Sequence, residues 1–184
     1  MQRRKFIATT VAAIPALALS QQLSAQNTRT EKGFVVKAAK SRFNESTLLF
    51  GGTSPNDIKV SAKDTSGKLT VFEYTGHVKG GPPLHLHEKQ DEMFFILEGE
   101  YTFKVGEDIY HLATGDMIFL PRKVPHCFAQ TTDKGKMLFM FQPSGKMEDY
   151  FRKLSTFTGP PTPEEGAKLF SDHEMKVVGP PLQF

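Results

Sequence analysis

Two histidines separated by one residue open the part of the sequence with the densest set of potential metal ligands. His85 and His87 begin the segment HLHEKQDEMFFILEG, which covers residues 85–99. In an extended strand, residues i and i+2 point to the same face, about 7 Å apart. Two imidazoles placed in this way can bind one transition-metal ion. The pair therefore predicts a metal site on a strand.

A carboxylate beside the two histidines would add a further ligand, and the same segment offers three. Glu88 directly follows His87 and would face away from it in a continuing strand. Asp91 or Glu92 would return beside the histidines if the chain makes a hairpin turn within 88–91. Spacing alone leaves Asp91 and Glu92 as alternatives.

A third histidine lies in a second segment, GDMIFLPRKVPHCFAQ, residues 115–130. We expect one strand to end at Pro121 and another to begin after Pro125, so that His126 reaches the site from a strand remote in sequence. Cys127 alternates with His126 and should be a buried thiol that faces away from the metal. As the only cysteine in the chain, it excludes an intramolecular disulfide and a multi-cysteine zinc site.

The remaining three histidines are not expected to be ligands. His111 should lie on the surface of a strand and His173 in a solvated helix. His77 could reach the rim of the metal pocket, but we do not expect it to bind the metal.

The elements that must position the ligands are expected to be strands. Between Phe43 and Gln142, runs of β-branched and aromatic residues start roughly every ten residues, with turns such as GGTSPN and KDTSG between them. The expected strands are STLLF (46–50), DIKVSA (57–62), KLTVFEY (68–74), EMFFIL, EYTFKV, DIYHLA, GDMIFL, HCFAQ and KMLFMF. This spacing is typical of an all-β sandwich or barrel.

The C-terminal tail has a different pattern. Residues 145–155 place apolar side chains at helical spacing, and 162–175 begin with a threonine cap, a proline and two acidic residues. VVGPPL then closes the chain in an extended form. We expect an N-terminal extension at 26–44, a barrel at 45–145 and a tail with short helices at 146–184.

The first 25 residues are typical of an export signal. A basic start, MQRRKF, precedes an apolar stretch at 6–19 that is too short to span a bilayer, and small residues follow. The arginine pair resembles a twin-arginine signal, but Gln2 replaces the usual serine or threonine, so the general secretory route stays open. We expect cleavage after Ala25 or Ser20 and a periplasmic or secreted bacterial protein. An uncleaved membrane anchor is the alternative.

The charge of the chain argues against a nucleic-acid partner. The net charge of +3 comes from Arg3, Arg4 and Lys5 in the signal segment. Without them, 20 basic residues face 20 acidic ones, so no basic surplus remains to bind phosphates. We also expect no membrane partner once the signal is removed.

Together the two histidine segments resemble the two motifs of the cupin superfamily. The first motif is matched by His85, His87, Glu92 and Gly99, and the second by Gly115, Pro121 and His126. Lys123 stands where a glycine is usual and Gln130 where an asparagine is common. The resemblance covers about residues 45–145, and the tail is similar to that of quercetin-dioxygenase-like single-domain cupins.

This resemblance implies a cupin jelly-roll β-barrel that holds one metal ion inside. The implied ligands are His85, His87, Glu92 and His126, so the resemblance favours Glu92 over Asp91. Three imidazoles and a carboxylate suit one divalent manganese, iron, cobalt, nickel, copper or zinc ion, and they leave one or two positions open.

Apolar residues should wall this metal off. Phe94 and Ile96 share the strand parity of Glu92, while Phe128 and Gln130 share that of the third histidine. An apolar lining would exclude water and hold a hydrophobic small molecule.

The outward-facing residues of the same strand predict self-association. Phe95 and Leu97 point away from the barrel and need cover, either from the tail helices or from a second subunit. We expect a homodimer.

The resemblance also implies a dioxygenase acting on an enol, enediol or phenolic, flavonol-like small molecule. The metal would lower the pKa of a substrate oxygen, and Glu92 would act as a general base. A non-oxidative metal-dependent isomerase, lyase or hydrolase, and a binding cupin without turnover, are the alternatives, because a fold does not fix a function.

Overall fold

The computed structural model describes residues 29–49 and 51–183. Its strands are β1 (Ser46–Leu49), β2 (Ser54–Val60), β3 (Thr70–Gly76), β4 (Pro83–His87), β5 (Asp91–Glu98), β6 (Tyr101–Val105), β7 (Asp108–Leu112), β8 (Met117–Leu120), β9 (His126–Gln130), β10 (Gly135–Gln142) and β11 (Met175–Pro181). The helices are η1 (Arg42–Asn44), η2 (Ala62–Thr65), α1 (Met147–Leu154) and α2 (Pro163–Asp172).

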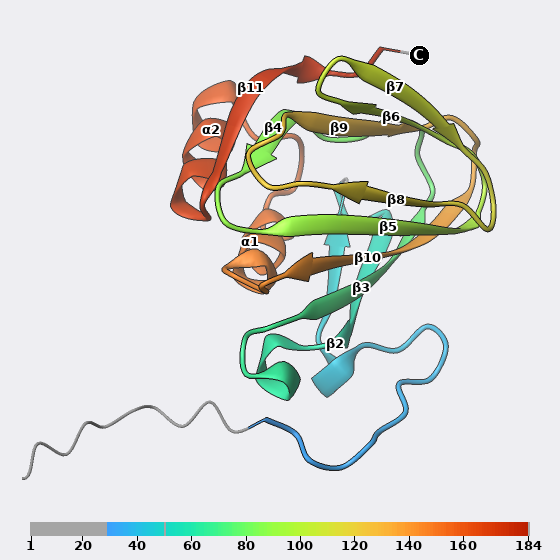
Figure 1. The fold of residues 1–184 in the computed structure, drawn as a ribbon, viewed down its shortest axis with the longest axis vertical. Helices are drawn as coiled ribbons and strands as arrows, with labels where there is room; N and C mark the ends of the chain where they lie inside the picture. The colour runs from blue at the N-terminus through green and yellow to red at the C-terminus, as the bar shows by residue number, and fades with distance from the viewer. Residues whose placement is uncertain (1–28, 50, 184) are drawn as a thin grey trace, which may run out of the picture.

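These strands form two antiparallel sheets that face each other around a common interior (Figure 1). The six-stranded sheet has the order β1-β2-β3-β10-β5-β8, and the five-stranded sheet has the order β11-β4-β9-β6-β7. The all-β prediction is therefore confirmed for the described residues.

Alternating apolar residues build the interior between the sheets. Along β3, β5 and β10 every second side chain is buried. Phe139 stacks between two neighbours, with its ring centroid 5.0 Å from that of Phe72 and 5.5 Å from that of Phe94. The middle of the barrel is thus a packed aromatic core rather than a channel.

Strand β2 begins earlier than the strand predicted at 57–62. Ser54 pairs with Leu49 and Asn56 with Thr47, so the predicted GGTSPN turn is shorter than expected. The reason is that Ser54 and Asn56 are polar residues typical of turns, yet both are fully buried within the strand. Phe50, the last residue of the first predicted strand, lies outside the described residues.

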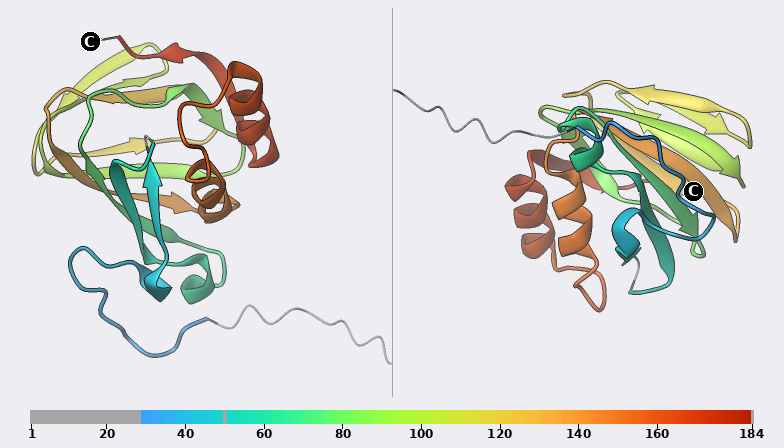
Figure 2. Two further views of the ribbon diagram at one scale, coloured as in Figure 1. Left: turned by 180° about the vertical axis from the view of Figure 1, so that it is seen from behind. Right: turned by 90° about the horizontal axis from the view of Figure 1, so that it is seen from below.

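Both predicted tail helices are present, and the extended C-terminal segment becomes a strand. The hydroxyl of Thr162 accepts a hydrogen bond from the backbone N–H of Glu165, whose carboxylate accepts one from the N–H of Thr162. This capping box starts α2. Helices α1 and α2 lie side by side next to the barrel (Figure 2), and β11 returns to pair with β4.

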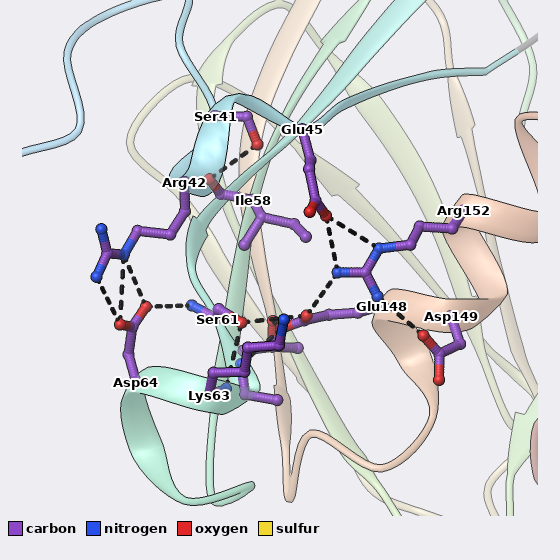
Figure 3. Close-up of polar contacts among 12 residues, drawn as sticks. Ser41, Arg42, Glu45, Ile58, Ser61, Lys63, Asp64, Glu148, Asp149 and Arg152 are labelled. Atoms are coloured by element: carbon purple, nitrogen blue, oxygen red, sulfur yellow. Dashed lines mark hydrogen bonds and ion pairs between the residues drawn. The ribbon is translucent and has the colours of Figure 1, made fainter. Parts of the chain in front are cut away.

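A buried carboxylate joins α1 to the first half of the chain (Figure 3). Glu148 accepts hydrogen bonds from Ser61 Oγ at 3.2 Å, from the Ala62 backbone N–H at 2.5 Å and from Thr70 Oγ1 at 2.9 Å. Arg152, one turn further along α1, donates to it at 3.2 Å. Because a buried carboxylate is costly without partners, these bonds hold α1 in place.

A second polar contact in the same view joins η1 to η2 (Figure 3). The guanidinium of Arg42 donates to Asp64 through Nε at 3.0 Å and through Nη2 at 2.8 Å. The backbone N–H of Ser61 and the hydroxyl of Thr30 complete the hydrogen bonds of this carboxylate. The N-terminal extension is thereby tied to the barrel.

Within residues 29–49 and 51–183, no helix is long and apolar enough to cross a membrane. The predicted export signal, residues 1–25, lies outside this part of the chain and stays a prediction.

Candidate metal centre

Four side chains from three strands converge inside the barrel, beside the tail helices. His85 and His87 come from β4, His126 from β9 and Glu92 from β5. Their ligand atoms all lie within 4.8 Å of one another, and all four side chains are buried. The structure thus brings together the four residues that were predicted as ligands.

Strand pairing places the three histidines. His85 and His126 are partners across β4 and β9, and alternation puts His87 on the same buried face as His85. Glu92 faces them from the six-stranded sheet, where it pairs with Phe141 of β10. The site therefore spans the interior from one sheet to the other.

The chain does not make the hairpin turn within 88–91 that would have returned Asp91 or Glu92 beside the histidines. Strands β4 and β5 belong to different sheets, so the chain crosses the barrel between them instead of turning back beside β4. Gln90, fully buried in this connection, donates a hydrogen bond to Glu174 at 3.0 Å. The short spacing between histidines and carboxylate is compatible with either path, which is why it did not reveal the crossing.

Backbone carbonyls orient two of the imidazoles. His85 Nδ1 lies 2.8 Å from the carbonyl oxygen of Pro83, and His126 Nδ1 lies 2.9 Å from that of Val124. A carbonyl oxygen only accepts, so each Nδ1 carries the proton and each Nε2 keeps its lone pair. Such a contact on the far ring nitrogen is the usual support of a metal-binding histidine.

Buried nitrogens at the centre of the site lack hydrogen-bond partners among the described residues. They are Nδ1 and Nε2 of His87 and Nε2 of His126. Glu92 Oε2 lies 3.4 Å from His87 Nε2 and 3.2 Å from His126 Nε2, but without the angles of a hydrogen bond. Leaving buried polar atoms unpaired is costly. A metal ion between them would satisfy both Nε2 atoms at once, so the cluster is compatible with one transition-metal ion.

The protonation states also suit metal binding. Burial lowers the pKa of His85 to about 3, helped by the neighbouring His126 and His87, so this imidazole is neutral near pH 7. Burial alone would raise the pKa of Glu92, but its contacts with His126 and His87 outweigh that effect and bring the pKa to about 2. Neutral imidazoles and ionised carboxylates are the forms that bind metals.

Asp91, the alternative ligand, is engaged elsewhere. Its carboxylate accepts hydrogen bonds from Arg122 Nη2 at 2.6 Å and from the Arg122 backbone N–H at 2.9 Å. The contact with this guanidinium lowers the pKa of Asp91. Adjacent residues on a strand face opposite sides, so Glu92 points inward while Asp91 binds the β8–β9 turn.

Aromatic side chains cover the cluster. The ring centroid of Phe170 on α2 lies 5.2 Å from that of His85, and the ring of Phe141 lies 5.1 Å from that of His87. Tyr150 on α1 packs against Phe170 at 5.3 Å. Burial, and then the charge of the carboxylate ligand, raise the pKa of its phenol. Helical spacing identified these helices but gave no sign that they cover the site.

The predicted lining residues all face the interior, at different depths. Phe94 and Ile96 are buried, and Phe128 packs its ring against Phe94 at 5.5 Å. Gln130 is fully buried and donates to the carbonyl oxygen of Thr132 at 2.9 Å. It lies four residues from the third histidine along β9, or about 13 Å, so it supports the far end of the barrel rather than the cluster.

The residues not expected to bind a metal lie outside the cluster. His77 and His111 are exposed, and Cys127 is buried, as predicted. His173, expected in a solvated helix, is instead half-buried at the end of α2. Its Nδ1 lies 2.7 Å from the carbonyl oxygen of Leu169.

The turn between β8 and β9 explains the glycine that is usual in the second motif. Lys123 has a φ of 66°, in the left-handed region that favours glycine. Its backbone N–H donates to the carbonyl oxygen of His87 at 2.7 Å. The unusual conformation therefore holds the turn against the strand that carries two of the clustered histidines.

Comparisons with known proteins agree with this geometry. Residues 72–142 match the family model of the cupin domain. Quercetin 2,3-dioxygenase from Bacillus subtilis (strain 168) is 28% identical over 110 residues, a match that covers 60% of this chain but 32% of that protein. An uncharacterized protein from Aquifex aeolicus (strain VF5) is 22% identical over 117 residues, which cover 57% of this chain and 97% of that one. The similarity to the dioxygenase is distant, and this chain spans about a third of its length.

Solved structures share the fold. A predicted oxalate decarboxylase from Thermotoga maritima aligns with a TM-score of 0.52 at 19% identity, over 60% of this chain and 99% of that one. An RmlC-like cupin from Shewanella frigidimarina aligns with a TM-score of 0.50 at 21% identity, over 63% and 95%. At these identities the alignments establish the fold alone, and they confirm the predicted jelly roll.

Proposed function

We propose that this protein is an exported, metal-dependent dioxygenase that acts on an enol or phenolic small molecule. The observation that carries the proposal is the buried cluster of three imidazoles and one carboxylate, with two Nε2 lone pairs left free by backbone contacts. The distant similarity to a quercetin 2,3-dioxygenase supports the reaction class.

In this proposal His85, His87, Glu92 and His126 hold one divalent manganese, iron, cobalt, nickel, copper or zinc ion. When bound, the ion supplies a Lewis acid that favours the deprotonated form of a substrate hydroxyl and, if it is redox-active, access to oxygen chemistry. The chain contributes a neutral imidazole at His85, because burial holds its pKa far below 7.

Glu92 has the second role of proton acceptor. It is ionised at neutral pH, and one of its oxygens lies within 3.4 Å of two imidazoles. A substrate hydroxyl that enters the cluster would therefore meet a carboxylate within hydrogen-bond reach, which is the first requirement of a general base.

The aromatic cover accounts for the kind of substrate. Phe141 and Phe170 pack apolar rings against the clustered histidines, and Tyr150 packs against Phe170. Such a lining excludes water and favours a flat, largely apolar molecule that carries few polar groups. Enols and phenols combine both properties.

The test begins with elemental analysis of the protein purified from its host without added metal. Oxygen uptake is then measured with an electrode on flavonols, catechols and small diketones, with His126→Ala as the matched control. We expect about one transition metal per chain and oxygen uptake that the control lacks. Turnover at the same rate without oxygen would instead indicate an isomerase, lyase or hydrolase. Ligand binding without turnover would indicate a binding protein, and absence of metal would refute the proposal.

A further inference from the structure

An apolar groove lies between the free edges of the two sheets. Strand β7 ends the five-stranded sheet and β8 ends the six-stranded sheet. The groove between them has a volume of about 300 Å³ and is lined by Val105, Tyr110, Leu112, Met117, Ile118 and Phe119. Met117 is 56% exposed and Phe119 54% exposed. Two unpaired strand edges beside exposed apolar side chains form a surface that proteins usually cover.

A second apolar surface lies on the N-terminal arm, which we define as residues 29–41. Val35 is 78% exposed, and Phe34 is also exposed. The arm contacts the rest of the chain near its ends, where the Thr30 N–H donates to Asp64 O and Lys59 Nζ donates to Lys40 O. Within the described chain, residues 31–36 pair with no strand.

The arm stands away from the sheet beneath it. A space of about 380 Å³ separates Phe34 and Val36 from Val60, Val71 and Leu138 on the outer face of the six-stranded sheet. An apolar segment that lies off its own sheet and belongs to no strand among the described residues can pair with a strand of another chain.

Charge makes the two surfaces complementary. The arm carries Arg29, Lys32, Lys37 and Lys40 against a single acidic residue, Glu31. Residues 105–119, which form the groove edges and the turn between them, carry Glu107, Asp108 and Asp116 and no lysine or arginine. Opposite charges beside the apolar residues of the arm and of the groove favour their association and fix how the arm aligns along the groove.

We propose that two copies of this chain form a twofold dimer in which the arm of each copy covers the β7–β8 groove of the other. One chain cannot make this contact with itself, because the arm lies at the β2 end of the molecule and β7 and β8 lie on the far side (Figure 1). Six extended residues span about 20 Å, enough to follow a four- or five-residue edge strand along its length. The contact is self-complementary and occurs twice per dimer. It does not depend on the proposed metal or reaction.

The first test is light scattering and sedimentation across a concentration series with the full chain as its host delivers it. We expect a dimer. Val35→Asp on the arm and Phe119→Glu in the groove should each raise the dimer dissociation constant at least tenfold. Val178→Glu is the control, because Val178 is also an exposed apolar residue, 41% exposed, and lies on β11, away from both the arm and the groove. It should leave the constant unchanged. All three sites are exposed, so circular dichroism should show folded variants.

The second test is a mixed disulfide between two differently labelled chains. Oxidation of Val35→Cys mixed with Phe119→Cys should give the heterodimer, whereas Val178→Cys mixed with Phe119→Cys should not; the native Cys127 is buried. A monomer at all concentrations would overturn the proposal. A dimer that tolerates Val35→Asp and Phe119→Glu but not Phe95→Glu would also overturn it, because the interface would then lie on the outer sheet face.

Discussion

At the residue scale, two backbone carbonyls decide what the clustered histidines can bind. The carbonyl oxygens of Pro83 and Val124 each lie two residues before a histidine and accept from its Nδ1. Both imidazoles therefore present Nε2 to the interior. Pro83 belongs to the same strand as His85, and Val124 lies in the turn just before the strand that begins at His126. The donor atoms of these two histidines therefore depend on local backbone geometry.

Single substitutions should separate the ligands from their neighbours. We expect His85→Ala, His87→Ala and His126→Ala to lose most of the bound metal after dialysis, measured by plasma mass spectrometry. Each variant should also lose the stabilisation that metal gives, about 3 kcal/mol when free metal is 100-fold above the dissociation constant. Glu92→Gln should keep more metal, because three imidazoles remain, but should lose turnover.

Asp91→Asn is the control for that series. Because Asp91 binds Arg122 rather than the cluster, this variant should keep its metal. The ligand assignment would be off by one residue if Asp91→Asn lost metal while Glu92→Gln kept both metal and activity. Unchanged metal content in all three histidine variants would reject the metal site.

Lys123 gives a residue-scale prediction about stability. Its φ of 66° costs a side-chain-bearing residue about 1 kcal/mol or more. Lys123→Gly should relieve this cost and, after the entropy that glycine adds to the unfolded chain, raise the free energy of unfolding by about 0.5 kcal/mol. Lys123→Val should lower it by about 1 kcal/mol, because β-branched residues fit this region worst. Urea denaturation measures both, and equal stability of the two variants would contradict the prediction.

At the scale of elements, the ties that hold the first half of the chain to the barrel are polar. Glu148 anchors α1 to η2 and β3, and Asp64 anchors η1 and the N-terminal arm to η2. The guanidinium of Arg42, with help from Ser61 and Thr30 and against the effect of burial, lowers the pKa of Asp64 from 3.8 to about 2. Folding therefore stabilises the ionised form of this carboxylate.

This shift predicts how stability depends on pH. A carboxyl group with a lowered folded pKa contributes stability above its unfolded pKa and loses it as the pH falls through the folded value. Asp64 should contribute about 2 kcal/mol at pH 7 and lose most of it between about pH 5 and 2. The measurement is the difference in unfolding free energy between the wild type and Asp64→Asn at each pH. A difference that stays constant over this range would contradict the assignment.

Strand type, helix type and the clustered residues could be predicted from the sequence, whereas connections between sheets could not. Runs of β-branched and aromatic residues between turns predicted β3, β5 and β10, and His-x-His spacing placed two imidazoles on one face. The crossing from β4 to β5 was missed, since a short polar linker fits a hairpin as well as a jump between sheets. The aromatic cover by Tyr150 and Phe170 was missed because packing between remote elements leaves no periodic signal.

At the scale of the whole molecule, export remains a prediction about residues 1–25. Their basic start, apolar stretch and small residues lead us to expect a mature protein that begins after Ala25 or Ser20. Intact-mass measurement of the protein from the periplasm or medium of its host checks this. A wild-type protein that stays in the cytoplasm and retains Met1, as a variant without the arginine pair should, would show that the segment is no signal.

The division of the cluster between the two sheets has a mechanical consequence. Three of its members belong to the five-stranded sheet, and the fourth belongs to the six-stranded sheet. An ion bound by all four residues would cross-link the two sheets. The chain has a single cysteine, so no intramolecular disulfide can provide such a cross-link. Taking the ion out would leave the ladders within each sheet intact and loosen only the seam between them. We therefore expect metal removal to weaken the contact between the two sheets before it weakens the pairing within either sheet.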